Sequence, residues 1–247
     1  MHEPVFREYA NSDTAVVFIH GMMGSPTQFT DLADAVYAQG CTYLSVLLPG
    51  HGVDAAAFTK FGLCDWETHL QGELNQLNGK YKKIYLAGHS MGGLLALNAS
   101  LRKENHIAGI LLISTPLRVY LLNLKSLLRK LRLLTWPKTH PIKSVYLGAN
   151  SIAKPKQWFC PPPIRPLAGL YRLMRKTKQH LPYVTVPVRM FFSQKDETTS
   201  YKSAVLLYDE LCNTQRDLFS LSHSWHAYYD EAERKHIVEQ LLELVGA

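Results

Sequence analysis

The sequence predicts an α/β fold in which a mostly parallel β-sheet is covered on both faces by helices. Short apolar runs rich in β-formers alternate with longer segments of helical periodicity, as in parallel sheets whose strands are connected by helices. The chain has 247 residues, 47% of them hydrophobic, so it can form one large domain with a modest insertion. It contains no run of about 18 apolar residues, so we expect no transmembrane helix.

Six segments are expected to be strands because they are short, apolar and rich in β-branched or aromatic residues. Most of them end at glycine, proline or serine clusters, which interrupt regular structure. One such cluster, Pro49-Gly50-His51-Gly52, cannot belong to a helix or an inner strand. The expected strands are 14–20, 41–47, the run that begins at Lys82, 107–113, 186–192 and 217–221.

Helices are expected after these strands because apolar residues recur at spacings that place them on one helical face. The first begins near Ser25-Pro26, where proline suits a first turn, and ends at Gly40. The others cover 66–77, the apolar segment that follows Ser90, 200–211, and a last segment that contains Ile237, Leu241, Leu242 and Val245.

The segment 117–183 interrupts the alternation and is expected to be a small helical cap between two late strands. The core domain then consists of 1–116 and 184–247. A helix that starts at Leu117 would place leucines on one face and basic residues on another, and a second helix is expected near 166–180. The leucines either face lipid or pack onto the domain below, and we expect the packing. The leucines are Leu117, Leu121, Leu124, Leu128 and Leu131, and the basic residues are Arg118, Lys125, Arg129 and Arg132.

The motif Gly88-x-Ser90-x-Gly92 lies between an expected strand and an expected helix. A direct strand-to-helix turn forces a strained backbone on the corner residue, and small residues two positions before and after it avoid a clash. The hydroxyl of Ser90 would then be exposed at the carboxyl edge of the sheet, at a helix N-terminus that favours a developing negative charge. Ser90 is therefore the candidate nucleophile.

A serine nucleophile needs a base and an acid that orients the base. In this topology both follow later strands, in the order serine, acid, histidine. Asp196 follows the strand 186–192, with Glu197 as the alternative acid, and His226 precedes the last helix, with His223 as the alternative base.

Two backbone N–H groups are expected to bind the oxyanion formed in acyl transfer. Met91 follows the nucleophile, and Met22 lies in the turn after the first strand. His20, His51 and His89 are expected to be structural rather than to act as bases. The residues expected to line the substrate pocket are Met23, His89, Leu117, Leu121 and Trp225.

Together these motifs resemble those of α/β-hydrolases, and within them the small bacterial carboxylesterases and monoacylglycerol lipases. The matching motifs are His20-Gly21-Met22-Met23-Gly24-Ser25-Pro26, Pro49-Gly50-His51-Gly52, Gly88-His89-Ser90-Met91-Gly92-Gly93, Asp196 in its loop, and Ser224-Trp225-His226. The resemblance covers almost the whole chain outside 117–183. It implies that Ser90, Asp196 and His226 form a triad and that Met22 and Met91 supply the oxyanion N–H groups. Relatives often carry Ser-Gly-His at the positions of Ser224-Trp225-His226, so Trp225 stands where they have glycine.

The composition limits the choice of partners and compartment. The formal charge is +7 and the pI is near 9.2, but no nucleic-acid-binding motif is present. We expect a solvated basic surface, with weak contact to an anionic membrane surface as an alternative. No secretory leader is recognisable and the four cysteines are scattered without metal-ligand spacing, so free thiols, no bound metal and a cytoplasmic location are expected.

The predicted function is that of a serine carboxylic-ester hydrolase acting on short- to medium-chain acyl esters or monoacylglycerols. The acyl-enzyme would be hydrolysed by water, so no cofactor is expected. The same triad would serve a thioesterase, an acyltransferase or an aromatic esterase. A non-enzymatic alternative is a membrane-binding module that uses the basic helix of the cap.

Overall fold

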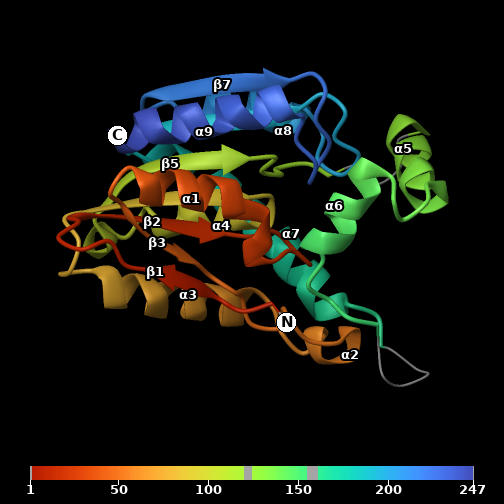
Figure 1. Ribbon diagram of the computed structural model, residues 1–247, viewed down its shortest axis with the longest axis horizontal. Helices are drawn as coiled ribbons and strands as arrows, with labels where there is room; N and C mark the ends of the chain where they lie inside the picture. The colour runs from red at the N-terminus through yellow and green to blue at the C-terminus, as the bar shows by residue number, and fades with distance from the viewer. Residues whose placement is uncertain (1, 120–123, 155–160, 247) are drawn as a thin grey trace.

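The computed structural model describes residues 2–119, 124–154 and 161–246, and its centre is a seven-stranded sheet (Figure 1). The strand order is β1-β3-β2-β4-β5-β6-β7. Strands β2 to β7 run parallel, and β1 pairs antiparallel with β3. The strands are β1 (Val5–Arg7), β2 (Thr14–Ile19), β3 (Thr42–Ser45), β4 (Lys83–His89), β5 (Ile107–Ile113), β6 (Val188–Ser193) and β7 (Arg216–Leu221).

The six predicted strands are confirmed, and β1 is an addition to them. Its three residues are all exposed at the edge of the sheet, so it lacks the apolar pattern by which strands are recognised. Backbone pairing holds it in place, with Val5 opposite Ser45 and Arg7 opposite Tyr43.

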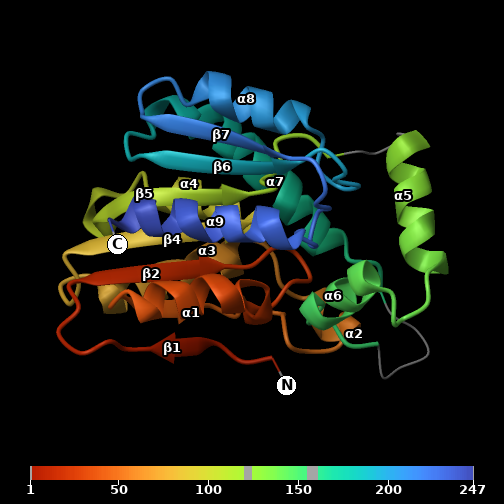
Figure 2. The same cartoon turned by 45° about the horizontal axis from the view of Figure 1, so that its top comes forward.

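Helices cover both faces of the sheet, as predicted (Figure 2). On one face, α1 (Thr30–Ala38) and α9 (Glu231–Val245) contact each other and share a core cluster that includes Phe18, Val36 and Ile237. The opposite face carries α3 (Leu63–Leu77), α4 (Met91–Ala99), α7 (Ile164–His180) and α8 (Lys202–Glu210). A short helix, α2 (Ala55–Phe58), precedes α3.

The described residues between β5 and β6 include three α-helices, α5 (Leu124–Thr135), α6 (Pro141–Ala149) and α7. Figures 1 and 2 show α5 and α6 beyond the carboxyl ends of the strands. Helix α7 instead packs against α3 and α4, and its Leu173 belongs to the main core cluster. The boundary of a separate cap domain at 117–183 stays a prediction.

The helix expected from Leu117 corresponds to α5, but residues 117–119 are not helical, so the prediction of its start is wrong. Leu117 is buried in the main core. The Ser203 hydroxyl bonds both the N–H and the carbonyl of Arg118, and Val119 forms a β-bridge with Thr199. These partners satisfy the backbone groups of Arg118 and Val119 outside a helix and therefore compete with helix formation. The remaining expected helix residues, 120–123, lie outside the described residues.

The leucines of α5 face away from the protein, contrary to the packing expected for them. Leu124 and Leu134 are 71% and 73% exposed, whereas Ser126 is buried. The Ser126 hydroxyl donates to the carbonyl of Glu197, and Arg129 donates to the carbonyls of Gln194 and Asp196 at 3.3 and 3.4 Å. Helix α5 therefore contacts the core through polar side chains that bind a loop, because this loop presents backbone carbonyls rather than apolar side chains.

None of the helices in the described parts of the chain is both long and apolar enough to cross a membrane. Cys41, Cys64 and Cys212 are free thiols, in agreement with the expectation. Cys160 lies outside the described residues.

Candidate active site

Ser90 lies at the corner between β4 and α4. Its backbone has φ 52° and ψ −118°, a region that a non-glycine residue occupies only under strain. Its N–H donates to the carbonyl of Ile113 at 2.8 Å, which fixes the corner to the end of β5. The strained serine predicted from the motif is therefore present at the carboxyl edge of the sheet.

The glycines around Ser90 allow the corner to pack closely. A Cβ at Gly92 would lie 1.9 Å from the carbonyl oxygen of Ile19, and one at Gly88 would lie 2.5 Å from the Cα of Gly93. Both distances are far below any real contact. The neighbouring backbone can approach only because these two positions lack side chains.

Ser90, His226 and Asp196 form a connected set of hydrogen bonds. Nε2 of His226 lies 3.1 Å from Oγ of Ser90, and Nδ1 lies 2.8 Å from Oδ2 of Asp196. The other carboxylate oxygen of Asp196 accepts the N–H groups of Thr198 and Thr199 at 2.7 and 2.6 Å. The imidazole therefore contacts the serine with one nitrogen and a buried, oriented carboxylate with the other.

The environment of His226 favours its protonated form. Burial acts to lower its pKa, but the charge and hydrogen bond of Asp196, together with the charge of Glu197, outweigh burial and raise the pKa above its ordinary value. A raised pKa strengthens the imidazole as a base and stabilises the imidazolium that forms after it has taken a proton.

The two alternative residues occupy other positions. The side chain of Glu197 accepts hydrogen bonds from the Tyr146 hydroxyl and from the backbone N–H of His226. The imidazole ring of His226 bonds to Asp196 instead. His223 is exposed, and its N–H donates to Glu233 at 3.0 Å. The geometry therefore favours Asp196 as the acid and His226 as the base.

The expected oxyanion donors lie at the two turns beside Ser90. Met91 is the first residue of α4, where N–H groups have no partner within the helix. Met22 lies in the turn closed by the hydrogen bond from the Gly24 N–H to the Gly21 carbonyl. The assignment of both as oxyanion donors stays a prediction.

His20 and His51 hold this turn in place. Nε2 of His20 accepts the N–H of Leu48 at 3.0 Å, and Nε2 of His51 accepts the N–H of Met23 at 3.2 Å. Burial lowers the pKa of His20, and it lowers the pKa of His51 to about 4. Both rings are therefore neutral at physiological pH and connect the loops after β2 and β3 as hydrogen-bonding groups.

The predicted pocket residues do not form one group. Met23 is 48% exposed, whereas Leu117 is buried in the core. Trp225 is buried, and its ring lies 5.4 Å from that of Trp136, which follows α5. Leu121 lies outside the described residues. Trp225 therefore contacts the segment between α5 and α6, which explains why a bulky residue is accommodated beside His226.

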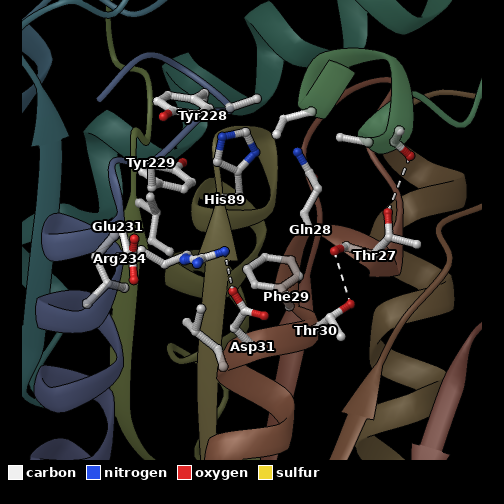
Figure 3. Close-up of a pocket in the computed structure, with 17 residues that line it drawn as sticks. Thr27, Gln28, Phe29, Thr30, Asp31, His89, Tyr228, Tyr229, Glu231 and Arg234 are labelled. Atoms are coloured by element: carbon white, nitrogen blue, oxygen red, sulfur yellow. Dashed lines mark hydrogen bonds and ion pairs between the residues drawn. The ribbon is translucent and has the colours of Figure 1, made fainter. Parts of the chain in front are cut away.

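A cavity of about 580 Å³ lies between α1, α6 and α9, next to the triad (Figure 3). Its walls are mostly apolar and include Phe29 and Ile237, and an ion pair of 2.7 Å between Arg234 and Asp31 lies along one side. His89, one of the predicted pocket residues, lines this cavity, but the candidate nucleophile Ser90 does not. The cavity therefore adjoins the back of the nucleophile corner rather than the serine hydroxyl.

His89 faces this cavity and also supports the triad. Its Nε2 donates to the carbonyl of His226 at 2.8 Å. Burial and the charge of His226 lower the pKa of His89 to about 3, so the ring stays neutral. The hydroxyl of Tyr229 donates to the same carbonyl at 2.9 Å. Sequence reasoning missed Tyr229, since an aromatic residue in a loop carries no catalytic pattern.

Comparisons with known proteins show the family to which the chain belongs. The family model described as serine aminopeptidase S33 matches residues 10–233. A thermostable monoacylglycerol lipase from a Bacillus species is 25% identical over 98% of this chain and 93% of its own length.

Two solved structures are similar in fold. One belongs to the metagenome-derived lipolytic enzymes LipS and LipT, with a TM-score of 0.78 and 21% identity over 99% of this chain and 97% of that chain. The other is a monoacylglycerol lipase from Paleococcus ferrophilus, with a TM-score of 0.73 and 16% identity over 99% of both chains. The family match covers most of the sequence, so the chain belongs to this family of α/β-hydrolases and is a serine hydrolase.

Proposed function

We propose that this enzyme hydrolyses carboxylic esters through a Ser90–His226–Asp196 triad, on short- to medium-chain acyl esters or monoacylglycerols. The observation on which the proposal rests is the contact of 3.1 Å between Nε2 of His226 and Oγ of Ser90, with Asp196 behind the ring. The monoacylglycerol lipases among the relatives support the choice of substrate.

The reaction proceeds in two halves. Oγ of Ser90 attacks the ester carbonyl carbon while Nε2 of His226 takes the hydroxyl proton, and the N–H groups of Met22 and Met91 bind the oxyanion. The C–O bond to the alcohol then breaks, and His226 gives its proton to the leaving alcohol. Water, deprotonated by His226, attacks the acyl-enzyme, which releases the carboxylic acid and returns the proton to Ser90.

Labelling with a fluorophosphonate probe tests this proposal, because the probe reacts with an activated serine. We expect the wild type to be labelled and Ser90→Ala to lose both the label and, by about 10⁴-fold or more, the hydrolysis of p-nitrophenyl acyl esters. Ser100→Ala, at the other end of α4, is the matched control and should retain both. Full activity of Ser90→Ala would contradict the proposal.

The choice of acyl group and bond needs a second measurement. The rate on p-nitrophenyl esters of increasing chain length, on monoacylglycerols, on acyl thioesters and on cinnamoyl esters gives a profile of kcat/KM. We expect the highest values for short- to medium-chain esters or monoacylglycerols. A maximum on thioesters or cinnamoyl esters, or transfer to an added alcohol in preference to water, would assign the triad to the corresponding alternative reaction.

We also propose that α5 makes weak contact with an anionic lipid surface. Its exposed leucines form an apolar face, and the helix carries Lys125, Arg129, Lys130 and Arg132 without any acidic residue. An apolar face next to basic groups suits an anionic interface. The cytoplasmic location stays a prediction from the sequence.

Co-sedimentation with lipid vesicles tests this contact. Binding should require anionic lipid and decrease as salt is added, because exposed charges are screened. Replacing Leu124 and Leu134 together by aspartate should abolish it. Val205→Asp on α8, a residue 47% exposed, is the control and should bind like the wild type. If the wild type fails to bind anionic vesicles at low salt, the contact is refuted.

A further inference from the structure

A second buried carboxylate lies beside the triad. Glu197 follows Asp196 directly, and its side chain is 3% exposed. One of its oxygens accepts the hydroxyl of Tyr146 at 2.8 Å and that of Thr198 at 3.3 Å, and the other accepts the N–H of His226 at 3.3 Å. Burying a carboxylate is unfavourable unless hydrogen bonds compensate for lost water. The triad as described makes no use of this side chain.

Tyr146 connects this carboxylate to the loop of the catalytic histidine. It lies on α6, and its hydroxyl donates to Glu197 and accepts the N–H of Ala227 at 3.2 Å. Burial, and after it the charge of Glu197, raise the pKa of Tyr146, so the phenol stays protonated and remains a donor. One hydroxyl therefore bridges the acid loop and the histidine loop.

The backbone of His226 is fixed on both sides. Its N–H donates to Glu197, and its carbonyl accepts His89 and Tyr229, which stand at the same end of the cavity in Figure 3. The ring bonds to Ser90 and Asp196 add to this, so each polar group of the residue has a partner. A small displacement of this backbone would move Nε2 away from the serine hydroxyl.

We infer that Glu197 and Tyr146 are positioning residues that hold the His226 loop against helix α6. The inference rests on the proposed function, because it concerns the base of that reaction. Helix α6 would then help to position His226 through one group, the hydroxyl of Tyr146. Neither side chain hydrogen bonds to Ser90, and both contact the loop of His226, so we expect both to act through His226.

The effect of Glu197 on His226 gives the inference a specific readout. The charged and titratable groups around this imidazole are Asp196, Glu197, Lys130 of α5, His89, Tyr146 and Tyr229. Glu197 raises the pKa of His226 and Lys130 lowers it. Removing the negative charge in Glu197→Gln should therefore lower the pKa of His226, so that the base stays neutral to a lower pH.

The expected result for Glu197→Gln is a shift of the acid limb of kcat/KM to lower pH, together with a fall in kcat of about tenfold or more. KM should change little, because no contact with the substrate is removed. Tyr146→Phe keeps the charge of Glu197, so kcat should fall similarly while the acid limb stays near that of the wild type. The two changes should be less than additive when combined, because they break one network.

Two matched controls separate these effects from a general loss of charge or hydroxyl. Glu243→Gln removes a carboxylate that pairs with Arg189 at the far side of the sheet, and Tyr171→Phe removes an exposed phenol from α7. Both should have the wild-type kcat and pH profile. Circular dichroism of every variant reports whether it folds.

The outcomes distinguish this inference from the proposed function. If the wild type shows Ser90-dependent hydrolysis but Glu197→Gln retains its acid limb and Tyr146→Phe retains its kcat, the inference is overturned. If Glu197→Gln does not fold, Tyr146→Phe decides through its kcat alone. If the wild type is neither labelled by fluorophosphonate nor active on esters, the proposed function itself fails. An NMR titration of His226 should show the lower pKa in Glu197→Gln independently of turnover.

Discussion

Ser90 shows how one residue combines backbone strain with chemistry. Its positive φ places the hydroxyl at the edge of the sheet. Relaxation is prevented because the backbone of α4 fills the space next to Gly88 and the end of β2 fills the space next to Gly92. The same corner starts α4, so the helix N-terminus is fixed relative to the nucleophile. The strained backbone therefore holds the Ser90 hydroxyl within hydrogen-bonding distance of His226.

The pH dependence of the wild type also belongs to the residue scale. In the proposed mechanism His226 must be neutral to act as a base, and Asp196 and Glu197 raise its pKa in spite of burial. We therefore expect kcat/KM to fall as the pH drops through a value above the ordinary 6.5 of histidine, and to level off above it.

His89, whose pKa is lowered to about 3, contributes no ionisation in this range. A profile of kcat/KM on a p-nitrophenyl ester between pH 4 and 9 measures the pH at which kcat/KM falls on the acid side. An acid limb below the ordinary histidine value would contradict the arrangement.

At the scale of elements, helices α5 and α7, which both lie between β5 and β6, differ in how they are held. Helix α7 is anchored through apolar side chains such as Leu173, which is fully buried, and through a hydrogen bond of 2.6 Å between Asn98 and Thr177. Helix α5 is anchored by the polar contacts of Ser126 and Arg129 and leaves its leucines outside. Loss of α5 contacts should therefore cost little stability, whereas loss of α7 packing should cost much.

This difference predicts the effect of two leucine substitutions of the same kind. Leu173→Ala on α7 should lower the free energy of unfolding by about 2–5 kcal/mol, because it leaves a cavity in the core. Leu134→Ala on α5 should change it by less than about 0.5 kcal/mol, because the side chain is 73% exposed. Urea denaturation of both variants measures the difference. Equal effects would show that α7 is not part of the core.

At the scale of the whole molecule, the sequence predicts the parts that follow a strong local pattern. Strands such as β5 are apolar throughout, and Ser90 and His226 lie in motifs at strand ends that the topology brings together. Residues such as Tyr146 could not be predicted, because their partners lie far along the chain and no spacing rule connects them. The prediction that the leucines of α5 pack onto the core is wrong, because periodicity identifies a face but not what covers it.

The proposed catalytic residues come from distant parts of the chain, and this has a consequence for biosynthesis. Ser90 and His226 are separated by 136 positions, and His226 lies between β7 and α9. A chain that has emerged only as far as β6 already contains the serine but lacks the histidine proposed to activate it. In the proposed mechanism, acyl transfer therefore has to wait until the segment from β7 to His226 has been synthesised and has folded against the corner at Ser90.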